Sequence, residues 1–301
     1  MRAIRAAEPS STSTARSARR RRRVLLALPL VAGGAIAAPL AAQTPGPPDR
    51  LADRGAGIPT SLFGTYIERG ELLVYLFYEY TRTTAFEYKP SELGFPGGED
   101  FLGETREQED LLFLSYGLSD RLSVELETAV HARTKFTKAA DDPSAVPARL
   151  EESGLGDLDL ELRWRWRPET EGHAETFSFL ELTPPLQKNR HLIGTQEWEA
   201  ALGFGFVRGH AWGTLSGRVA IAYDGAGRQV ELGEYAIEYL KRVSPRWRFV
   251  AALEGESDEL SLIGEAQWFL GPHALLKLNC GFGITEKAPD LAPEVGVMFR
   301  F

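Results

Sequence analysis

A strict alternation of apolar and charged residues is the feature that most constrains the fold of this chain. Residues Leu158–Arg167 read LDLELRWRWR, so leucine or tryptophan alternates with a charged residue throughout. An α-helix would spread these charges around its circumference, whereas a β-strand places them all on one face. Strands of about 9–11 residues with one apolar and one polar face are typical of membrane-spanning β-barrels. The pattern therefore predicts a barrel strand here.

Twelve segments follow this pattern, although the alternation is broken in three of them (71–84, 175–183 and 230–242). Together they predict an all-β fold: a transmembrane antiparallel β-barrel of about 12 strands that occupies residues 70–301. A soluble β-sandwich would also alternate, but it would not explain the aromatic and terminal features described below. The predicted strands are residues 71–84, 107–118, 121–134, 156–167, 175–183, 195–207, 211–223, 230–242, 246–256, 260–270, 274–285 and 294–301.

The connections between these segments differ in length in a regular way. Those after the even-numbered strands are compact, whereas several after odd-numbered strands, such as 85–106 and 135–155, are long and rich in Pro, Gly and charge. Outer-membrane barrels have short periplasmic turns and longer external loops. Aromatic residues gather near the short turns, where their rings suit a headgroup belt. They are Trp164, Trp166, Phe204, Phe206, Tyr239, Trp247, Phe249, Trp268, Phe299 and Phe301.

The first 42 residues have the features of a secretory signal peptide. A basic region that ends at Arg23 precedes the apolar stretch 24–36, and small residues lead to Gln43. This segment carries eight Arg and one Glu, so its removal changes the net charge from −8 to −15. Such an acidic chain is not expected to bind nucleic acid. We expect export to a Gram-negative outer membrane. Residues 43–69 are expected to form a periplasmic leader, with a small plug at Ile58–Ile67 as the alternative.

The polar faces of the predicted strands should point into the barrel. Their order along the strands places acids toward the external mouth and arginines toward the periplasmic end, with Arg133 as an exception. Cross-lumen ion pairs and a cation-favouring path are both compatible with this pattern. The expected inward acids are Glu79, Glu125, Glu127, Asp159, Glu161, Glu197, Glu199, Glu234, Glu238, Glu254, Glu256 and Glu265, and the expected inward bases are Arg133, Arg163, Arg165, Arg218, Arg248 and Lys277.

The sequence contains no recognisable catalytic constellation. Its five His and one Cys are dispersed without metal-ligand spacing, and no Gly-x-Ser-x-Gly elbow is present. His131 and Ser123 share a predicted strand and are both expected to face the lumen, and Cys280 is expected at an outward, apolar position. No catalytic residue, metal site or cofactor is predicted. An outer-membrane lipid hydrolase is the enzymatic alternative.

The final segment, Glu294–Phe301, alternates up to a terminal aromatic residue. It resembles the closing strand of bacterial outer-membrane β-barrels, in which the last aromatic residue is part of the signal read by the barrel-assembly machinery. The resemblance implies that Phe299 and Phe301 form an insertion signal. It also implies outer-membrane lipid and the assembly machinery as partners.

Two patches, Glu152–Trp166 (ESGLGDLDLELRWRW) and Tyr116–Val124 (YGLSDRLSV), resemble the family of putative transporters named after the MetA pathway of phenol degradation. The resemblance implies an outer-membrane barrel that passes small solutes, aromatic or other hydrophobic compounds among them, by passive diffusion. A structural or adhesive barrel without conductance is the alternative. We expect Gly154 and Gly156 to serve the turn into the strand rather than to contact a ligand.

Overall fold

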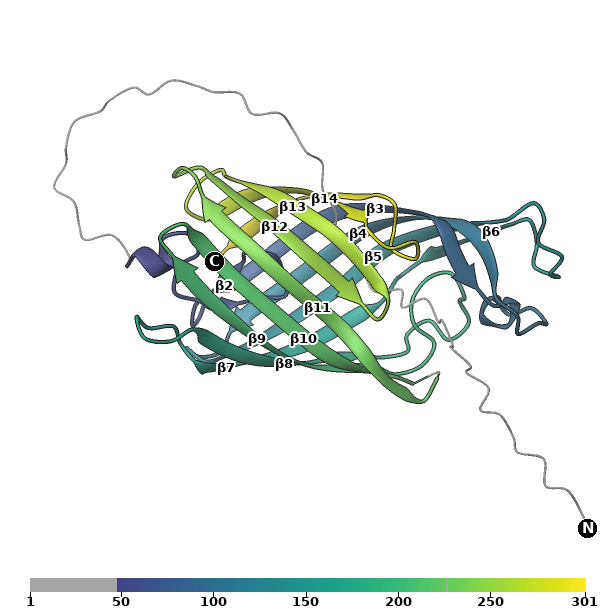
Figure 1. Cartoon of the computed structure of the whole chain (residues 1–301), viewed down its shortest axis with the longest axis horizontal. Coiled ribbons are helices and arrows are strands. Elements are labelled where there is room, and N and C mark those ends of the chain that lie inside the picture. The colour runs from purple at the N-terminus through teal and green to yellow at the C-terminus, as the bar shows by residue number, and fades with distance from the viewer. Residues whose placement is uncertain (1–47, 226) are drawn as a thin grey trace, which may run out of the picture.

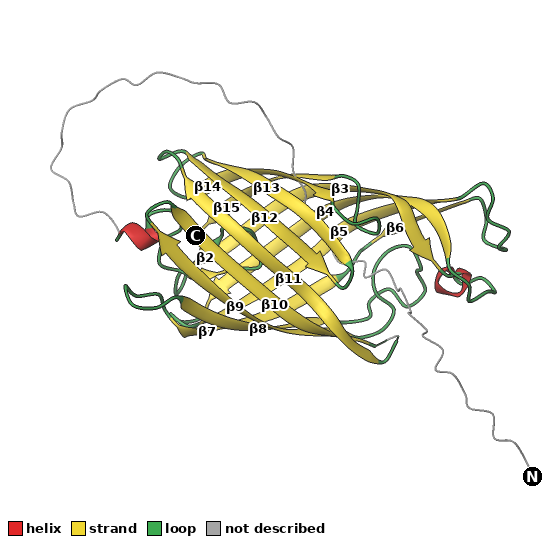
Figure 2. Cartoon of the chain, viewed as in Figure 1, coloured by secondary structure: helices red, strands yellow, loops and turns green. Residues whose placement is uncertain are grey.

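The computed structural model describes residues 48–225 and 227–301 of the chain, and the predicted signal peptide lies outside them. Neighbouring strands form one antiparallel sheet that closes on itself, because β15 pairs with β3 and β4 pairs with β5 (Figures 1 and 2). The strands of this sheet are β3 (Leu72–Tyr88), β4 (Phe101–Gly117), β5 (Leu122–Lys138), β6 (Arg149–Gly154), β7 (Leu158–Arg167), β8 (Glu175–Thr183), β9 (Glu199–His210), β10 (Gly213–Asp224), β11 (Gln229–Arg242), β12 (Trp247–Glu256), β13 (Glu259–Phe269), β14 (Ala274–Gly283) and β15 (Ala292–Arg300).

Strands β6 and β7 are successive parts of one barrel position, since both pair with β5. The barrel therefore has twelve strands around its circumference, which confirms the predicted fold class. The break falls in the Gly-Leu-Gly-Asp motif. Gly154 has a φ of +157°, and a Cβ on Gly156 would lie 2.6 Å from the Cβ of Ala129. Gly154 thus adopts a backbone conformation that other residues rarely adopt, and Gly156 leaves room for the side chain of Ala129.

A β-bulge in β5 reverses the side-chain pattern of that strand. The register passes from Ala129↔Leu111 to His131↔Asp110, which leaves Val130 as the extra residue. Because side chains alternate between the two faces, one extra residue moves all later side chains to the opposite face. The inward positions are therefore odd-numbered up to Ala129 and even-numbered from Ala132 onward.

This bulge corrects two of the sequence-based expectations. Arg133 and His131 do not face the lumen; they lie on the outer surface, where Arg133 contacts Glu151 at 2.5 Å and His131 contacts Asp110 at 3.6 Å. The apparent exception of Arg133 to the charge order along the lumen disappears, because its side chain is not in the lumen. Ser123 is fully buried on the inward face, so it is not on the same face as His131.

Most outward side chains on the remaining strands are apolar and exposed, as lipid contact requires, although a few, such as Ser178 and Arg208, are polar. On β7, Leu160, Leu162, Trp164 and Trp166 are all exposed, whereas Glu161 is buried. The aromatic residues predicted to lie near the short turns are all exposed as well. Trp247 and Trp268 stack across two neighbouring strands, with ring centroids 5.9 Å apart, and other pairs, such as Trp164 and Trp166, contact each other along one strand. They form an aromatic belt at the end of the barrel that carries the short turns.

We call the two ends of the barrel the short-turn end and the long-loop end; in outer-membrane barrels these correspond to the periplasm and the exterior. At the long-loop end the structure differs from the sequence-based boundaries. Residues 85–106 and 135–155 are not simply loops, because β3, β4 and β5 run on for 17 residues each and project beyond the other strands (Figure 1). A buried aromatic cluster that includes Tyr88 and Phe136 holds this projection together.

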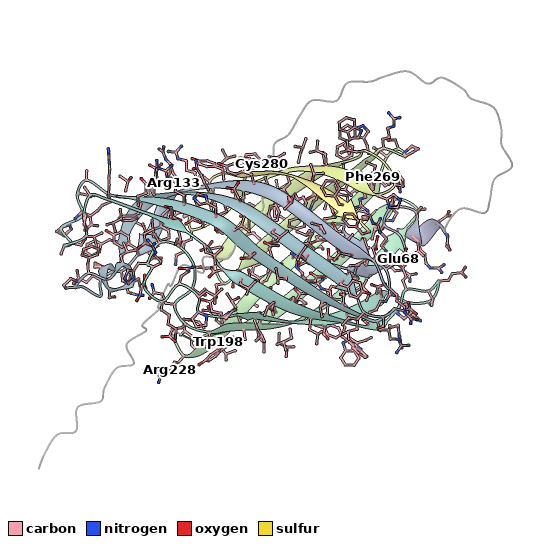
Figure 3. The ribbon with its side chains drawn as sticks, turned by 180° about the vertical axis from the view of Figure 1, so that it is seen from behind. Glu68, Arg133, Trp198, Arg228, Phe269 and Cys280 are labelled. Atoms are coloured by element: carbon pink, nitrogen blue, oxygen red, sulfur yellow. The ribbon has the colours of Figure 1, made fainter. Side chains whose placement is uncertain are left out.

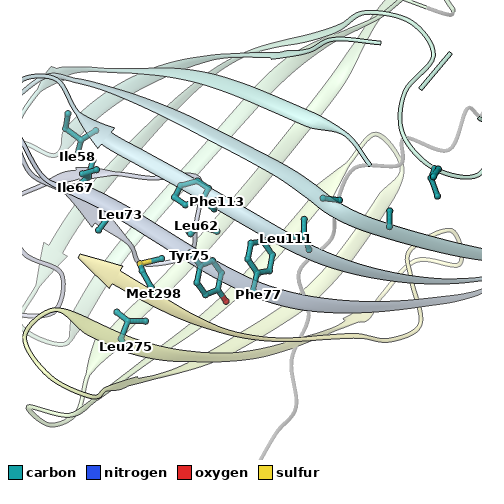
Figure 4. Packing of buried hydrophobic residues seen from close by; sticks show 13 residues of the cluster. Ile58, Leu62, Ile67, Leu73, Tyr75, Phe77, Leu111, Phe113, Leu275 and Met298 are labelled. Atoms are coloured by element: carbon teal, nitrogen blue, oxygen red, sulfur yellow. The ribbon is translucent and has the colours of Figure 1, made fainter. Parts of the chain in front are cut away.

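The segment before the barrel turns into its interior. After the short 3-10 helix η1 (Asp49–Leu51), strands β1 (Ile58–Pro59) and β2 (Tyr66–Ile67) form a small hairpin. Within the described residues, no helix is long and apolar enough to cross a membrane. The hairpin packs against inward-facing side chains of the barrel wall (Figure 4). The buried cluster contains Ile58, Leu62, Ile67, Leu73, Tyr75, Phe77, Leu111, Phe113, Ala129, Ala132, Ile193, Leu275 and Met298.

Candidate solute vestibule

The interior of the barrel contains a cavity toward the long-loop end, which we call the acidic vestibule. It encloses about 1050 Å³, including space open to solvent. Ser61 and Phe63 of the hairpin lie at its floor, and strands from most of the barrel contribute to its wall. Its charged lining comprises ten carboxylates and one guanidinium: Glu125, Glu127, Asp157, Asp159, Glu161, Glu181, Glu199, Glu234, Glu254, Glu256 and Arg218.

Arg218 of β10 is the cation of this lining and lies at the centre of a network. Its guanidinium forms ion pairs with Glu234 and Glu238 of β11 and, at 2.9 Å, with Glu254 of β12. The register places these strands next to one another, so the three carboxylates converge on one side chain. The guanidinium also lies 5.7 Å from the ring centroid of Phe63. Arg218 thus joins the wall to the floor of the vestibule.

Three strands away from β10, Arg163 of β7 performs a similar role. Its Nε lies 2.6 Å from Glu161 and 4.0 Å from Glu125, and all three side chains are almost fully buried. Glu125 in turn accepts hydrogen bonds from the backbone nitrogen and the hydroxyl of Ser61, at 3.0 and 2.8 Å. Because a buried charge is costly without partners, these contacts offset part of the cost of burying the three side chains inside the barrel.

Below the vestibule, residues 49–67, which we call the N-terminal segment, fill the short-turn end. Arg165 donates from Nη1 to the carbonyl oxygens of Ala56 and Gly57, at 2.9 and 3.0 Å. On the other side, the amide of Gln267 donates to the carbonyl oxygen of Phe63 at 3.0 Å. Barrel side chains thus hold the backbone of this segment from at least two strands. These contacts close the floor of the vestibule.

Ionic contacts anchor the start of the same segment. Arg54 lies 2.8 Å from Glu169 in the β7–β8 turn and 3.4 Å from Glu175 of β8. Burial opposes the charge of Arg54, but the nearby Tyr66 and the two carboxylates together raise its pKa above the ordinary value. Arg54 therefore stays charged. Asp53 accepts a hydrogen bond from the backbone nitrogen of Arg242 at 2.9 Å, which adds a tie to β11.

Most of the predicted lumen residues lie on the inner face, but not all of them line the vestibule. Glu265 and Lys277 are fully buried below it and form an ion pair at 3.1 Å. Arg248 is buried and donates to the side-chain oxygen of Gln267 at 2.7 Å. Glu197 is a correction: it is exposed in the connection before β9, because that strand begins at Glu199 rather than at residue 195. Glu79 and Glu294 face inward outside the vestibule lining.

Two vestibule carboxylates were not identified from the sequence. Asp157 lies in the break between β6 and β7, where no alternation exists, and accepts hydrogen bonds from the backbone nitrogen and hydroxyl of Thr195 at 2.5 and 3.1 Å. Glu181 lies on β8, whose sequence FSFLELT alternates poorly. The signal that could have placed Glu181 inward is its position between Leu180 and Leu182, both of which are exposed on the outer face.

Among the described residues, no group of three or more His, Cys, Asp or Glu side chains has the geometry to hold a metal ion. The single cysteine, Cys280, is fully buried and packs against Ala292 and Leu291. The carboxylates of the vestibule thus form a charged lining distributed over many strands. Such a lining acts through its summed field rather than through one coordination site.

Comparisons with known proteins agree with this architecture. A barrel described as the COG4313 outer membrane channel from Pseudomonas putida F1 is similar with a TM-score of 0.55 and 16% identity, over 78% of this chain and 97% of that one. The translocator domain of autotransporter NalP from Neisseria meningitidis is similar with a TM-score of 0.51 and 10% identity, over 78% of this chain and 90% of that one. The fold is therefore that of an outer-membrane β-barrel. No family model matches the chain, and no curated protein does so either.

Proposed function

We propose that this chain is an outer-membrane channel that admits small solutes passively at its long-loop end, after export directed by residues 1–42. The observation that carries the proposal is the acidic vestibule, a cavity inside a lipid-facing barrel that is open to solvent and lined by ten carboxylates. A barrel with a purely structural role could fill its lumen with paired and apolar side chains. A similar structure described as an outer membrane channel adds support.

The lining favours cations over anions. Ten carboxylates face one lining guanidinium, and the barrel wall between them and the lipid has a low dielectric constant, which focuses the field in the cavity. The resemblance to transporters linked to phenol degradation implies aromatic solutes, and Phe63, Phe113 and Ile263 supply an apolar part of the lining. We therefore propose small organic cations with an apolar part as the favoured solutes.

Reversal potentials in planar bilayers under a salt gradient test the selectivity. The variant Glu181→Gln/Glu199→Gln/Glu254→Gln/Glu256→Gln should lose part of its cation preference at low salt, because six of the ten lining carboxylates remain. It should differ little from the parent near molar salt, because the Debye length falls from about 10 Å at 0.1 M to about 3 Å at 1 M. The matched control neutralises four exposed carboxylates outside the vestibule, Glu99, Glu171, Glu197 and Glu286, and should retain the parent's preference. Anion selectivity of the parent, or equal effects of the two variants, would reject this proposal.

A non-conducting structural barrel is the second candidate, and it is favoured by the N-terminal segment that fills the short-turn end. The two candidates differ in one measurement. A channel should conduct intermittently as the parent chain and more continuously when residues 49–67 are deleted. A structural barrel should remain silent in the parent. Heat-dependent mobility on a gel would verify that both proteins form folded barrels before their conductance is compared.

A further inference from the structure

A cluster of basic side chains lies on the outer surface of the barrel, away from the vestibule. Strands β3, β4 and β5 place six side chains there, which we call the outer basic patch: Tyr80, Arg82, Arg106, Gln108, Arg133 and Lys135. Five of them, all except Arg82, line a surface hollow of about 540 Å³, including space open to solvent, and no carboxylate belongs to its lining. Figure 3 labels Arg133 at the base of the projecting strands. All members of this lining can donate hydrogen bonds.

The strand register arranges these side chains in two rows across three strands. Tyr80 pairs with Gln108, which pairs with Arg133; the next row contains Arg82, Arg106 and Lys135 as direct neighbours. Like charges directly opposite each other on adjacent strands destabilise a sheet. The row of three cations is therefore an arrangement that an anion would stabilise. The placement of Arg133 and Lys135 in these rows depends on the bulge at Val130, which turns both side chains outward.

Carboxylates on the same surface compensate only part of this charge. Glu104 contacts Arg82 and Arg106 at 3.0 and 2.7 Å. Glu151 contacts Arg133 at 2.5 Å and Lys135 at 4.0 Å. Four cations are thus shared between two carboxylates, which leaves a surplus of two positive charges within the two rows; Asp110, in the next row, contacts His131 at 3.6 Å. Each of the four basic side chains is still 42–54% exposed, so the donors remain accessible.

The height of the patch places it beside the lipid headgroups. Leu76 and Val130, both more than half exposed, mark the edge of the lipid-facing surface on β3 and β5. Tyr80 follows Leu76 by four residues, about 13 Å along the strand and about 10 Å in height at a tilt of about 40°. Outward side chains at the long-loop end of the other strands, such as Ile221, Val230 and Phe282, are apolar. The outward basic side chains of the strands at this end thus lie on β3–β6, whereas other exposed cations there, such as Arg228, lie in connecting loops.

We propose that the outer basic patch binds the phosphate groups of an anionic glycolipid in the outer leaflet. Arginine forks match phosphate oxygens bidentately, and Lys135, Gln108 and Tyr80 add single donors around the hollow. The row Tyr78, Asp110 and His131 separates the patch from the apolar surface of Leu76, Leu112 and Val130, along which the acyl chains of the same molecule would lie. One bound lipid would therefore neutralise the surplus positive charge with its phosphates and cover the nearby apolar surface with its acyl chains. It would also stabilise strands β3–β5 where they begin to project beyond the barrel.

Binding of diphosphorylated lipid A to the refolded, detergent-solubilised chain tests the proposal, with adducts counted by native mass spectrometry across a lipid titration. The variant Arg82→Gln/Arg106→Gln/Arg133→Gln/Lys135→Gln should bind at least about tenfold more weakly, given the contribution of each basic residue near a lipid surface. The control Arg121→Gln/Arg167→Gln/Arg228→Gln/Arg246→Gln removes the same charge from four other exposed positions. Its affinity should stay within about twofold of the parent.

Two further ligands identify the source of the phosphate. Dephosphorylated lipid A should bind the parent as weakly as diphosphorylated lipid A binds the patch variant, and millimolar inorganic phosphate should not displace the phosphorylated lipid. Equal losses in the two quadruple variants, or equal binding of both forms of lipid A, would overturn the proposal. Full displacement by inorganic phosphate would also overturn it, because the patch would then be a free-anion site. Heat-dependent gel mobility confirms that every variant is folded.

Discussion

Arg54 and Glu169 form a buried ion pair, 2.8 Å long, that joins the N-terminal segment to the turn between β7 and β8. Both side chains are 1% exposed. The two residues are 115 positions apart in the chain, so their contact depends on the tertiary structure. It fixes the point at which the segment leaves the short-turn end and enters the barrel.

Breaking this pair should release the N-terminal segment. Arg54→Gln removes the nearest cation of Glu169, which keeps Arg208 at 3.7 Å, while Glu175 keeps Arg165 at 3.4 Å. The cost should therefore stay below the about 3–5 kcal/mol that is typical when a buried charge loses its partner completely. We expect the segment to become accessible to protease at residues 49–67 while the barrel remains folded, and the open probability in bilayers to rise. Lys241→Gln, which removes a more exposed partner of Asp53, is the control and should change both readouts little. Unchanged proteolysis of the Arg54 variant would show that the segment is held by its apolar contacts alone.

The facing of β7 can be tested by charge substitution. Leu162→Arg places a charge in the lipid-facing surface and should lower the free energy of unfolding by about 2–4 kcal/mol in urea titrations of the refolded barrel. Leu162→Phe keeps the surface apolar and should have a small effect. Glu161→Lys should also be destabilising, because Glu161 is the buried partner of Arg163 and the new cation would face that guanidinium. A tolerated Leu162→Arg would contradict the outward orientation.

The bulge in β5 predicts opposite labelling of adjacent positions. Arg133→Cys should react on intact cells with a membrane-impermeant maleimide, because Arg133 lies on the outer surface. Thr134→Cys should remain unlabelled, because Thr134 is 3% exposed and faces inward. The parent chain is a suitable background, since its one cysteine is fully buried. Labelling of Thr134→Cys but not of Arg133→Cys would contradict the bulge and show that Arg133 faces the lumen.

The insertion signal predicted at Phe299 and Phe301 remains to be tested. Phe301 is 72% exposed, and its backbone exchanges two hydrogen bonds with Leu72, so its ring makes little contribution to packing. Deletion of Phe301 should nevertheless lower the amount of assembled barrel in the outer membrane more than deletion of Ala145 in the β5–β6 loop. Similar outer-membrane levels of the two variants, measured against total expression, would show that assembly does not depend on the aromatic ring.

The vestibule illustrates which site residues a sequence can reveal. Glu199 and Glu254 were predicted inward because they continue an alternation that is already regular around them. Asp157 could not be found in this way, because it lies in a break between strands and reaches the cavity only through the path of the backbone. The sequence predicts Glu197 inward because the alternation continues before Glu199. However, β9 begins only at Glu199, so Glu197 lies outside the strand.

The sequence by itself determined the fold class, the number of strands around the barrel and the belt of aromatic residues, because the alternation of side chains is a local property of each strand. Only the tertiary structure decided three other features. A bulge is visible only through strand pairing, so the outward position of Arg133 could not be predicted. The length of β3–β5 was hidden because strands beyond the lipid need no apolar face. The burial of residues 49–67 depended on contacts with Glu169, Arg165 and Gln267, which lie far away in the chain.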